Sequence, residues 1–149
     1  ASDELTVHNV TGRDSNQIGL STTNGSNHTI KNCRVQSADE DGIISGQPSS
    51  IVSNCYVSSV GRDGIVSSSA DSVTNSCVVS NSGRHGILMS ADDSIAIGNR
   101  VLSSTNDGIN IGGIDCIVAN NRVSDSGITN IRDAGTGTVL DGNPTGPSN

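Results

Sequence analysis

The chain has 149 residues, the length of a single domain, with one aromatic residue, Tyr56, and a formal net charge of −7. Nucleic-acid binding usually needs clustered Lys and Arg with aromatic side chains for base stacking, so this composition argues against a nucleic-acid partner. No apolar run approaches the roughly 20 residues of a membrane-spanning helix, so we expect no membrane span.

Residues 1–30 show only a weak form of the pattern that dominates the rest of the chain. Val7, Val10, Ile18 and Leu20 predict short strands of an early coil. The segment 22–27, which contains Asn24 followed by Gly25, predicts a short loop insertion. We therefore expect an irregular first coil over residues 1–30.

Residues 31–143 repeat with a period of 22 residues. The dipeptide Gly-Ile recurs at 42–43, 64–65, 86–87 and 108–109. A second column with the same period holds Cys33, Cys55, Cys77, Asn99 and Asn121, and each member is followed two positions later by valine. Independent columns that share one period indicate a solenoid of stacked units.

Within each unit, short apolar stretches alternate with the period of a β-strand, as in 95–97 and 109–111. Three short strands and three turns fit 22 residues, and stacking would bring equivalent residues to about 4.8 Å, the strand-pairing distance. The sequence thus predicts an all-β fold, a right-handed single-stranded parallel β-helix with about five regular coils and irregular ends.

We predict a single domain over 1–149, with an irregular first coil at 1–30, regular coils at 31–143 and a tail at 144–149. Pro144 and Pro147 favour a tail because proline cannot donate a ladder hydrogen bond. We expect this domain to be a segment of a larger protein or assembly.

The predicted strands differ in how clearly they show their inward face. Ile43 and its equivalents face the core in the first strand, whereas the register of the second strand stays open, since Ile51 and Val52 are both apolar. The Cys/Asn column occupies the turn between the second and third strands, where Asn would suit a left-handed backbone and bond to Asn in neighbouring coils. Of its three cysteines at most one pair could form a disulfide, and we favour reduced, buried thiols.

The pattern of Gly-Ile, a second apolar strand, Asn or Cys, and then Val resembles the parallel β-helix repeat of the pectate-lyase-like superfamily over about residues 18 to 143. That superfamily includes polysaccharide lyases, glycoside hydrolases, mannuronan C-5 epimerases and viral tailspikes, so the resemblance implies a fold and not one activity. Residues 82–87, with Arg84-His85-Gly86, are similar to the Arg-His-Gly coil that lies beside the sugar in the epimerases. The catalytic Asp and His of the epimerases are missing from the matching stretches 44–47 and 67–70, so their catalysis is not carried over.

Two arginines and their neighbours form the candidate glycan-binding site, namely Arg62, Asp63, Arg84 and His85. Stacked arginines beside a histidine could hold a sugar carboxylate or sulfate, because Arg presents paired donors. The alternative is that they are turn residues in solvated ion pairs with Asp63 and Glu40. The acidic stretches 39–41 and 92–93 lack a calcium-binding repeat and the Cys and His residues lack zinc spacing, so we predict no metal and no cofactor.

Ile44, Val66 and Leu88 alternate with the inward residues of the first strand and predict an outward apolar line across three coils. Exposed apolar patches tend to be contact surfaces. We expect this line to mediate self-association, for example as a trimer, or docking on a neighbouring domain of the same assembly. The alternative is that the N-terminal segment or a loop covers it.

These features favour a non-catalytic structural or adhesion module of an extracellular, cell-surface or virion-surface assembly, with contacts to acidic glycans. The alternative is a fragment of a carbohydrate-active enzyme, a polysaccharide lyase, hydrolase or C-5 epimerase-like protein acting on acidic polysaccharide. The enzyme question stays open at this point. The missing paired carboxylates argue for the non-catalytic interpretation.

Overall fold

The computed structural model describes residues 4–144, which form 19 short strands and no helix. Sheet A contains β1 (Thr6–His8), β4 (Thr29–Lys31), β7 (Ile51–Ser53), β10 (Val73–Asn75), β13 (Ile95–Ile97), β16 (Ile117–Ala119) and β19 (Val139–Asp141). Sheet B contains β2 (Thr11–Ser15), β5 (Arg34–Ala38), β8 (Tyr56–Val60), β11 (Val78–Ser82), β14 (Arg100–Ser104) and β17 (Arg122–Ser124). Sheet C contains β3 (Leu20–Thr22), β6 (Ile43–Ser45), β9 (Ile65–Ser67), β12 (Ile87–Met89), β15 (Asp107–Ile111) and β18 (Thr129–Asp133).

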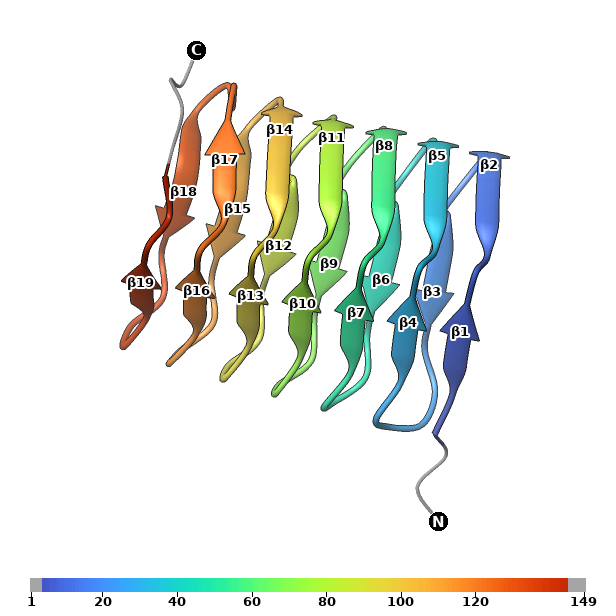
Figure 1. The fold of residues 1–149 in the computed structure, drawn as a ribbon, viewed down its shortest axis with the longest axis horizontal. Helices are drawn as coiled ribbons and strands as arrows, with labels where there is room; N and C mark the ends of the chain where they lie inside the picture. The colour runs from blue at the N-terminus through green and yellow to red at the C-terminus, as the bar shows by residue number, and fades with distance from the viewer. Residues whose placement is uncertain (1–3, 145–149) are drawn as a thin grey trace.

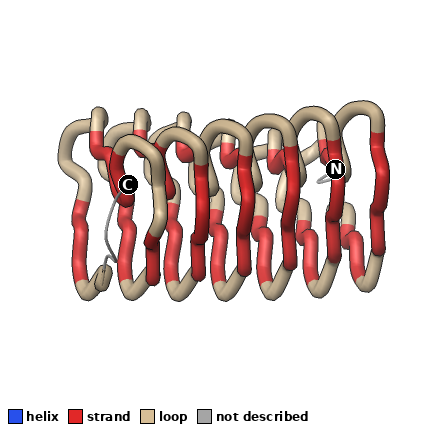
Figure 2. The backbone as a smooth tube through the Cα atoms, turned by 90° about the horizontal axis from the view of Figure 1, so that it is seen from above, coloured by secondary structure: helices blue, strands red, loops and turns tan. Residues whose placement is uncertain are grey.

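The chain passes through sheets A, B and C in turn, and each pass makes one coil of a parallel β-solenoid with about six coils. Every strand pairs in parallel with its equivalents in the coils before and after it, so that Val79 lies between Val57 and Val101. In Figure 1, sheet A lies below sheet B at the front of the molecule, and sheet C lies behind them. Seen from above, the coils follow one another in a single row (Figure 2). The predicted fold class is confirmed.

The core is a narrow interior filled by columns of side chains from all three sheets. Sheet C contributes isoleucine and sheet B contributes valine, and Ile43, Ile65, Val57 and Val79 all have 0% exposure. Sheet A points its middle residue inward, because Val52 is buried whereas Ile51 is 40% exposed. This settles the register that the sequence left open. Alanine or threonine takes the inward place in some coils of sheet A, which shows how little space the interior offers.

Three corners per coil turn the chain, and at each corner one residue has a positive φ. The corner columns are Asn9, Asn32, Asn54, Ser76, Gly98 and Asn120 between sheets A and B; Asp14, Ser37, Ser59, Asn81, Ser103 and Asp125 at the end of sheet B; and Asn27, Ser49, Asp71, Asp93 and Asp115 before sheet A. Gly, Asn and Asp enter this region at the lowest cost. The heavy use of small polar residues therefore follows from the corners.

The reason we gave for asparagine in the Cys/Asn column is wrong. The left-handed residue at this corner is the preceding one, Gly98 before Asn99 and Asn120 before Asn121. The side chains of the column are buried. The expected hydrogen bond between asparagines of neighbouring coils is present, since the Asn99 side chain donates to Asn121 Oδ1 at 2.9 Å. Because the left-handed residue supplies the turn, the next side chain is free to point inward.

Cysteine and asparagine can share this column because both side chains reach the backbone carbonyl at the equivalent position of the preceding coil, although Cys77 Sγ lies nearer to the oxygen of Asn75, at 3.2 Å. The Nδ2 of Asn99 donates to the oxygen of Thr74 at 2.9 Å, and the Sγ of Cys77 lies 3.7 Å from the oxygen of Val52. Each acceptor lies 25 residues before its donor. All four cysteines are buried with free thiols, and burial raises the pKa of Cys33 and of Cys116.

The strand register shows one additional residue in the segment for which the sequence predicts a loop insertion. Thr22 pairs with Ser45, 23 positions later, whereas Thr29 pairs with Ile51, 22 positions later. The additional residue thus lies between Thr22 and Thr29, where Gly25 has a φ of 101°. In the predicted tail, residues 145–149 lie outside the described residues.

Glycine before the sheet C isoleucine lets successive coils approach, which gives a first prediction. A Cβ at Gly64 would lie 2.2 Å from Val79 Cγ1 and 2.5 Å from the backbone oxygen of Gly86. We expect Gly64→Ala to lower the free energy of unfolding by about 3 kcal/mol, measured by urea denaturation. Gly112→Ala is the control, since its Cβ meets nothing closer than 3.9 Å. Equal stability of the two variants would contradict the prediction.

Candidate functional site

The corner that leads from sheet B into sheet C carries the predicted site residues. Two glycines bracket the pair of charged or polar side chains in two coils, at Gly61-Arg62-Asp63-Gly64 and at residues 83–86. A Cβ at Gly61 would lie 2.0 Å from the backbone oxygen of Asp39 in the preceding coil. Glycine therefore lets the coils pack closely enough for side chains of this corner to reach the backbone of the next coil.

Asp41, Asp63, His85 and Asp107 form one column along this corner, here called the aspartate column. The side chain in one coil accepts a hydrogen bond from the backbone N–H in the next coil. Asp41 Oδ1 accepts from Asp63 N at 3.0 Å, and Asp63 Oδ1 accepts from His85 N at 3.0 Å. His85 Nδ1 continues the series and accepts from Asp107 N at 3.3 Å. Histidine thus occupies an aspartate position.

Arg84 is bound tightly to the carboxylate of the coil before it. Its Nε donates to Asp63 Oδ1 at 2.8 Å, and its Nη2 forms an ion pair with Asp63 Oδ2. The hydrogen bond to Asp63 raises the pKa of Arg84 above its ordinary value. Asp63 is fully buried, so this guanidinium neutralises a carboxylate that water cannot reach.

Arg62 differs from Arg84 although it occupies the same position of the repeat. Its Nη1 lies 3.7 Å from Asp41 Oδ2, and its side chain is 50% exposed. Among the described residues, the Arg62 guanidinium donates no hydrogen bond, so most of its N–H groups face solvent. Arg62 is therefore the arginine of this corner that can bind a ligand without leaving a buried carboxylate unpaired.

His85 and Asp107 form the third pair of the column. His85 Nδ1 lies 3.3 Å from Asp107 Oδ2, and that oxygen accepts a hydrogen bond from Asn110 Nδ2 at 2.7 Å. Burial lowers the pKa of His85, against the opposing effect of Asp63 and Asp107. A neutral imidazole fits the geometry, because an unprotonated Nδ1 can accept the Asp107 N–H. Ile128 stands where an arginine would pair with Asp107, and the buried Oδ1 of Asp107 has no hydrogen-bond partner within residues 4–144.

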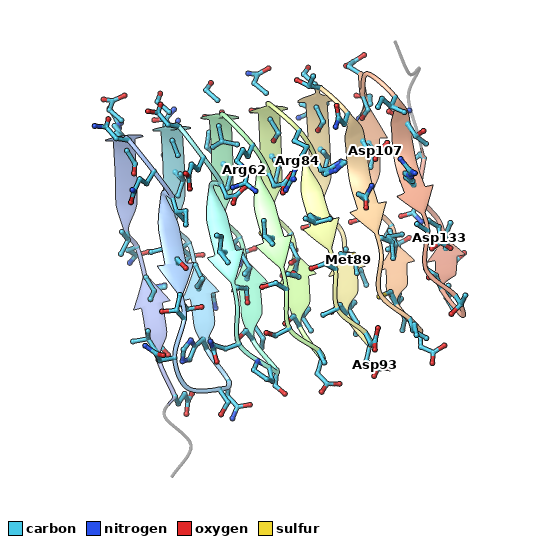
Figure 3. The ribbon with its side chains drawn as sticks, turned by 180° about the vertical axis from the view of Figure 1, so that it is seen from behind. Arg62, Arg84, Met89, Asp93, Asp107 and Asp133 are labelled. Carbon is cyan, nitrogen blue, oxygen red and sulfur yellow. The ribbon has the colours of Figure 1, made fainter. Side chains whose placement is uncertain are left out.

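The structure brings the four predicted residues Arg62, Asp63, Arg84 and His85 together in adjacent coils. Arg62, Arg84 and Asp107 lie in a row across neighbouring coils (Figure 3). The charges are layered, since the carboxylates are almost fully buried and the two guanidinium groups are partly exposed. An anion that approaches this corner meets the arginines first.

The predicted apolar line on sheet C lies in register but is less exposed than expected. Ile44, Val66 and Leu88 pair directly with one another, and Asn110 and Arg132 extend the same column. Ile44 and Leu88 are half-buried, and Val66 is only 9% exposed. The column thus changes from apolar to cationic toward the C-terminal coils.

Two outward faces were missed by the sequence reasoning. On sheet A, the residue before the inward position is apolar from β7 onward, and Ile51, Ile117 and Val139 are 40%, 40% and 53% exposed. On sheet B, the position before each core valine holds Arg34, Tyr56, Val78, Arg100 and Arg122 in register. Strand alternation read outward from the valine column would have revealed the second face.

An open groove of about 680 Å³ follows the corner at the end of sheet B. It is lined mostly by small polar residues and glycine, with Ser37, Ser59, Asn81 and Ser103 at the left-handed positions. Within the described residues, no three His, Cys, Asp or Glu side chains converge on a metal-binding position. Residues 4–144 contain no helix that is long and apolar enough to cross a membrane.

The chain is similar to known proteins in sequence and in fold. The model of the family described as "right handed beta helix region" matches residues 1–146. The chain belongs to this right-handed beta helix family. No curated protein matches the chain. These comparisons do not show the similarity to the epimerases that residues 82–87 suggested.

A solved structure of similar fold is the enzymatically active domain of tailspike protein 2 from bacteriophage CBA120. It superimposes with a TM-score of 0.79 at 14% sequence identity and covers 95% of this chain. The right-handed beta helix of this chain spans only 24% of that chain. At this identity the likeness establishes the fold and carries no site residue over.

The difference between the two arginines gives a second prediction. Arg84→Ala leaves the buried carboxylate of Asp63 without its guanidinium, so we expect it to lower the free energy of unfolding by about 3 kcal/mol. Arg62→Ala removes an exposed, long ion pair and should cost less than about 1 kcal/mol. Urea denaturation of both variants measures the difference. Adding Asp63→Asn to Arg84→Ala should recover part of the loss, and a similar loss in both single variants would contradict the assignment.

Proposed function

We propose that the chain is a non-catalytic β-helical structural or adhesion module of an extracellular or virion-surface assembly, and that it contacts acidic glycans at the aspartate column. The layered charge of that column carries the proposal. Asp63 has a side-chain exposure of 0%, whereas that of Arg62 is 50%. A sugar carboxylate or sulfate would therefore meet guanidinium donors, with which Arg forms paired hydrogen bonds.

The comparisons support a surface role. The similar solved structure is the enzymatically active domain of a bacteriophage tailspike protein. A stacked β-solenoid gives length along one axis and repeats its surface every coil, which suits a module that spans a distance and presents a contact face.

The alternative function is that of a fragment of an enzyme acting on acidic polysaccharide. The observation in its favour is the pair of His85 and Asp107, with an unpartnered oxygen on the buried carboxylate. Glycoside hydrolysis needs two carboxyl groups that reach the scissile bond. Asp63 and Asp107 are both almost fully buried, and Asp63 is engaged by Arg84 and the His85 N–H, so the non-catalytic function fits better.

Glycan binding is tested with soluble alginate and dextran sulfate as probes and neutral dextran as the reference, by isothermal titration calorimetry. We expect both polyanions to bind, and Arg62→Ala to weaken binding about tenfold, because it removes a charge-assisted contact. Lys31→Ala, the same charge change on sheet A, is the control. Absence of binding in the parent, or equal binding by Arg62→Ala, would exclude this site. Release of new reducing ends from alginate that Asp107→Asn abolishes would favour the enzyme.

The column of Ile44, Val66 and Leu88 is the second part of the proposal. We infer that it packs against another copy of the chain or against a neighbouring domain of the same assembly. Its support is the in-register row of three apolar side chains on the outer side of sheet C. Such a row is a contact surface more often than a free surface.

Light scattering tests this contact face. We expect the parent to have at least twice the mass of a single chain, which is 15.1 kDa. Leu88→Asp should have the mass of a single chain, because a carboxylate cannot be buried in an apolar contact. Ile117→Asp introduces the same charge on sheet A and should leave the mass unchanged. A monomeric parent rules out self-association, and dissociation by Ile117→Asp alone would place the contact on sheet A instead.

A further inference from the structure

The outer side of sheet B is cationic in a protein that is strongly acidic. Four of the arginines lie in its strands, and the one carboxylate within them, Asp14, sits at the left-handed corner where β2 ends. We call the residues Arg13, Arg34, Arg100 and Arg122 the sheet-B arginine face. These strands lie side by side along the molecule (Figure 1). Arg34, Arg100 and Arg122 begin their strands, whereas the aspartate column lies beyond the ends of the strands, at the corner into sheet C. The face is therefore separate from the aspartate column.

Arg100 and Arg122 stand directly opposite each other on neighbouring strands. The register pairs them, and both are exposed. Like charges directly opposite in a sheet are destabilising. Within residues 4–144, neither arginine forms an ion pair with a carboxylate, although Arg62 and Arg84 both do. A repulsive pair without a counterion in a chain with 15 acidic residues does not serve the fold, and it is suited to an external anion.

Arg34 and Tyr56 occupy the same outward column nearer the N-terminus. The Arg34 guanidinium lies over the Tyr56 ring, 4.4 Å from its centroid. A cation–π contact holds the guanidinium in place and leaves its N–H donors at the edge available to a ligand. The second column between the two clusters holds Gln36 and Ser80, which are half-buried, and Ser58, which is buried; all three have uncharged hydrogen-bonding side chains.

The spacing of these groups indicates the size of the ligand. Arg34 and Arg122 lie four strands apart along one column, about 19 Å at the usual strand spacing. A single small anion cannot reach both. We propose that the sheet-B arginine face binds a linear acidic polysaccharide that lies along the solenoid axis, with its carboxylate or sulfate groups on Arg34, Arg100 and Arg122.

A polysaccharide fits this face better than a single-stranded nucleic acid does. Binding of single strands relies on successive aromatic platforms for the bases, and Tyr56, the one aromatic residue of the chain, is already covered by Arg34. Hydroxyl and amide side chains beside the arginines match sugar hydroxyls.

The test compares three variants of the full chain on size-selected alginate chains and on dextran sulfate, by calorimetry at low and high salt. We expect Arg100→Ser with Arg122→Ser to weaken binding at least tenfold, and the wild-type affinity to fall with salt. Lys31→Ser with Arg132→Ser changes the charge equally on sheets A and C and should change the affinity less than twofold. Each titration is fitted with two sets of sites, and Arg62→Ser should weaken only the set at the aspartate column, so loss at one site is distinguished from loss at the other.

Thermal unfolding accompanies each titration. The Arg100 and Arg122 variant should unfold at the same temperature as the parent or higher, because a repulsion is removed, so lost binding cannot be ascribed to misfolding. We also expect a disaccharide of alginate to bind far more weakly than long chains. Unchanged affinity in this variant, an equal loss in the Lys31 and Arg132 control, or tighter binding of oligo(dT) than of alginate would each overturn the proposal.

Discussion

The in-register stacking of equivalent residues is the constraint on which the structure depends. Each strand pairs with its counterpart one coil away, so every side chain lies about 4.8 Å from copies of its own position. A column is stable only if its residue type is compatible with itself. Isoleucine on isoleucine and valine on valine meet this requirement in a narrow interior, which is why the chain folds around a core without Phe or Trp.

The same constraint governs the two buried polar columns. Asn99 and Asn121 bond to each other and to backbone carbonyls, and the cysteines of that column reach equivalent carbonyls. The aspartate column bonds to backbone N–H groups of the next coil, and His85 does so with its ring nitrogen. Substitution within a column is tolerated where the hydrogen bond to the neighbouring coil is preserved, since a buried polar group without a partner is costly.

Stacking also separates structural charges from charges that are available for binding. Repeated carboxylates would repel one another, and at Asp63 this is resolved by the arginine of the following coil. Arg100 and Arg122 repeat in the same way without such a partner among the described residues. The contrast assigns Arg84 mainly to the fold and leaves Arg62 and the sheet-B arginine face for external anions.

The sequence by itself determined the period, the β-solenoid, the columns of the core and the position of the loop insertion, because stacked coils place equivalent residues 22 positions apart in the chain. It also brought Arg62, Asp63, Arg84 and His85 together, since residues of one column must be neighbours. Only the tertiary structure decided which of Ile51 and Val52 faces inward, because two adjacent apolar residues satisfy strand alternation equally and the corner geometry selects between them. It also decided which residue of a corner is left-handed and which arginine donates hydrogen bonds to a buried carboxylate, since both depend on the distance between neighbouring coils at the corner.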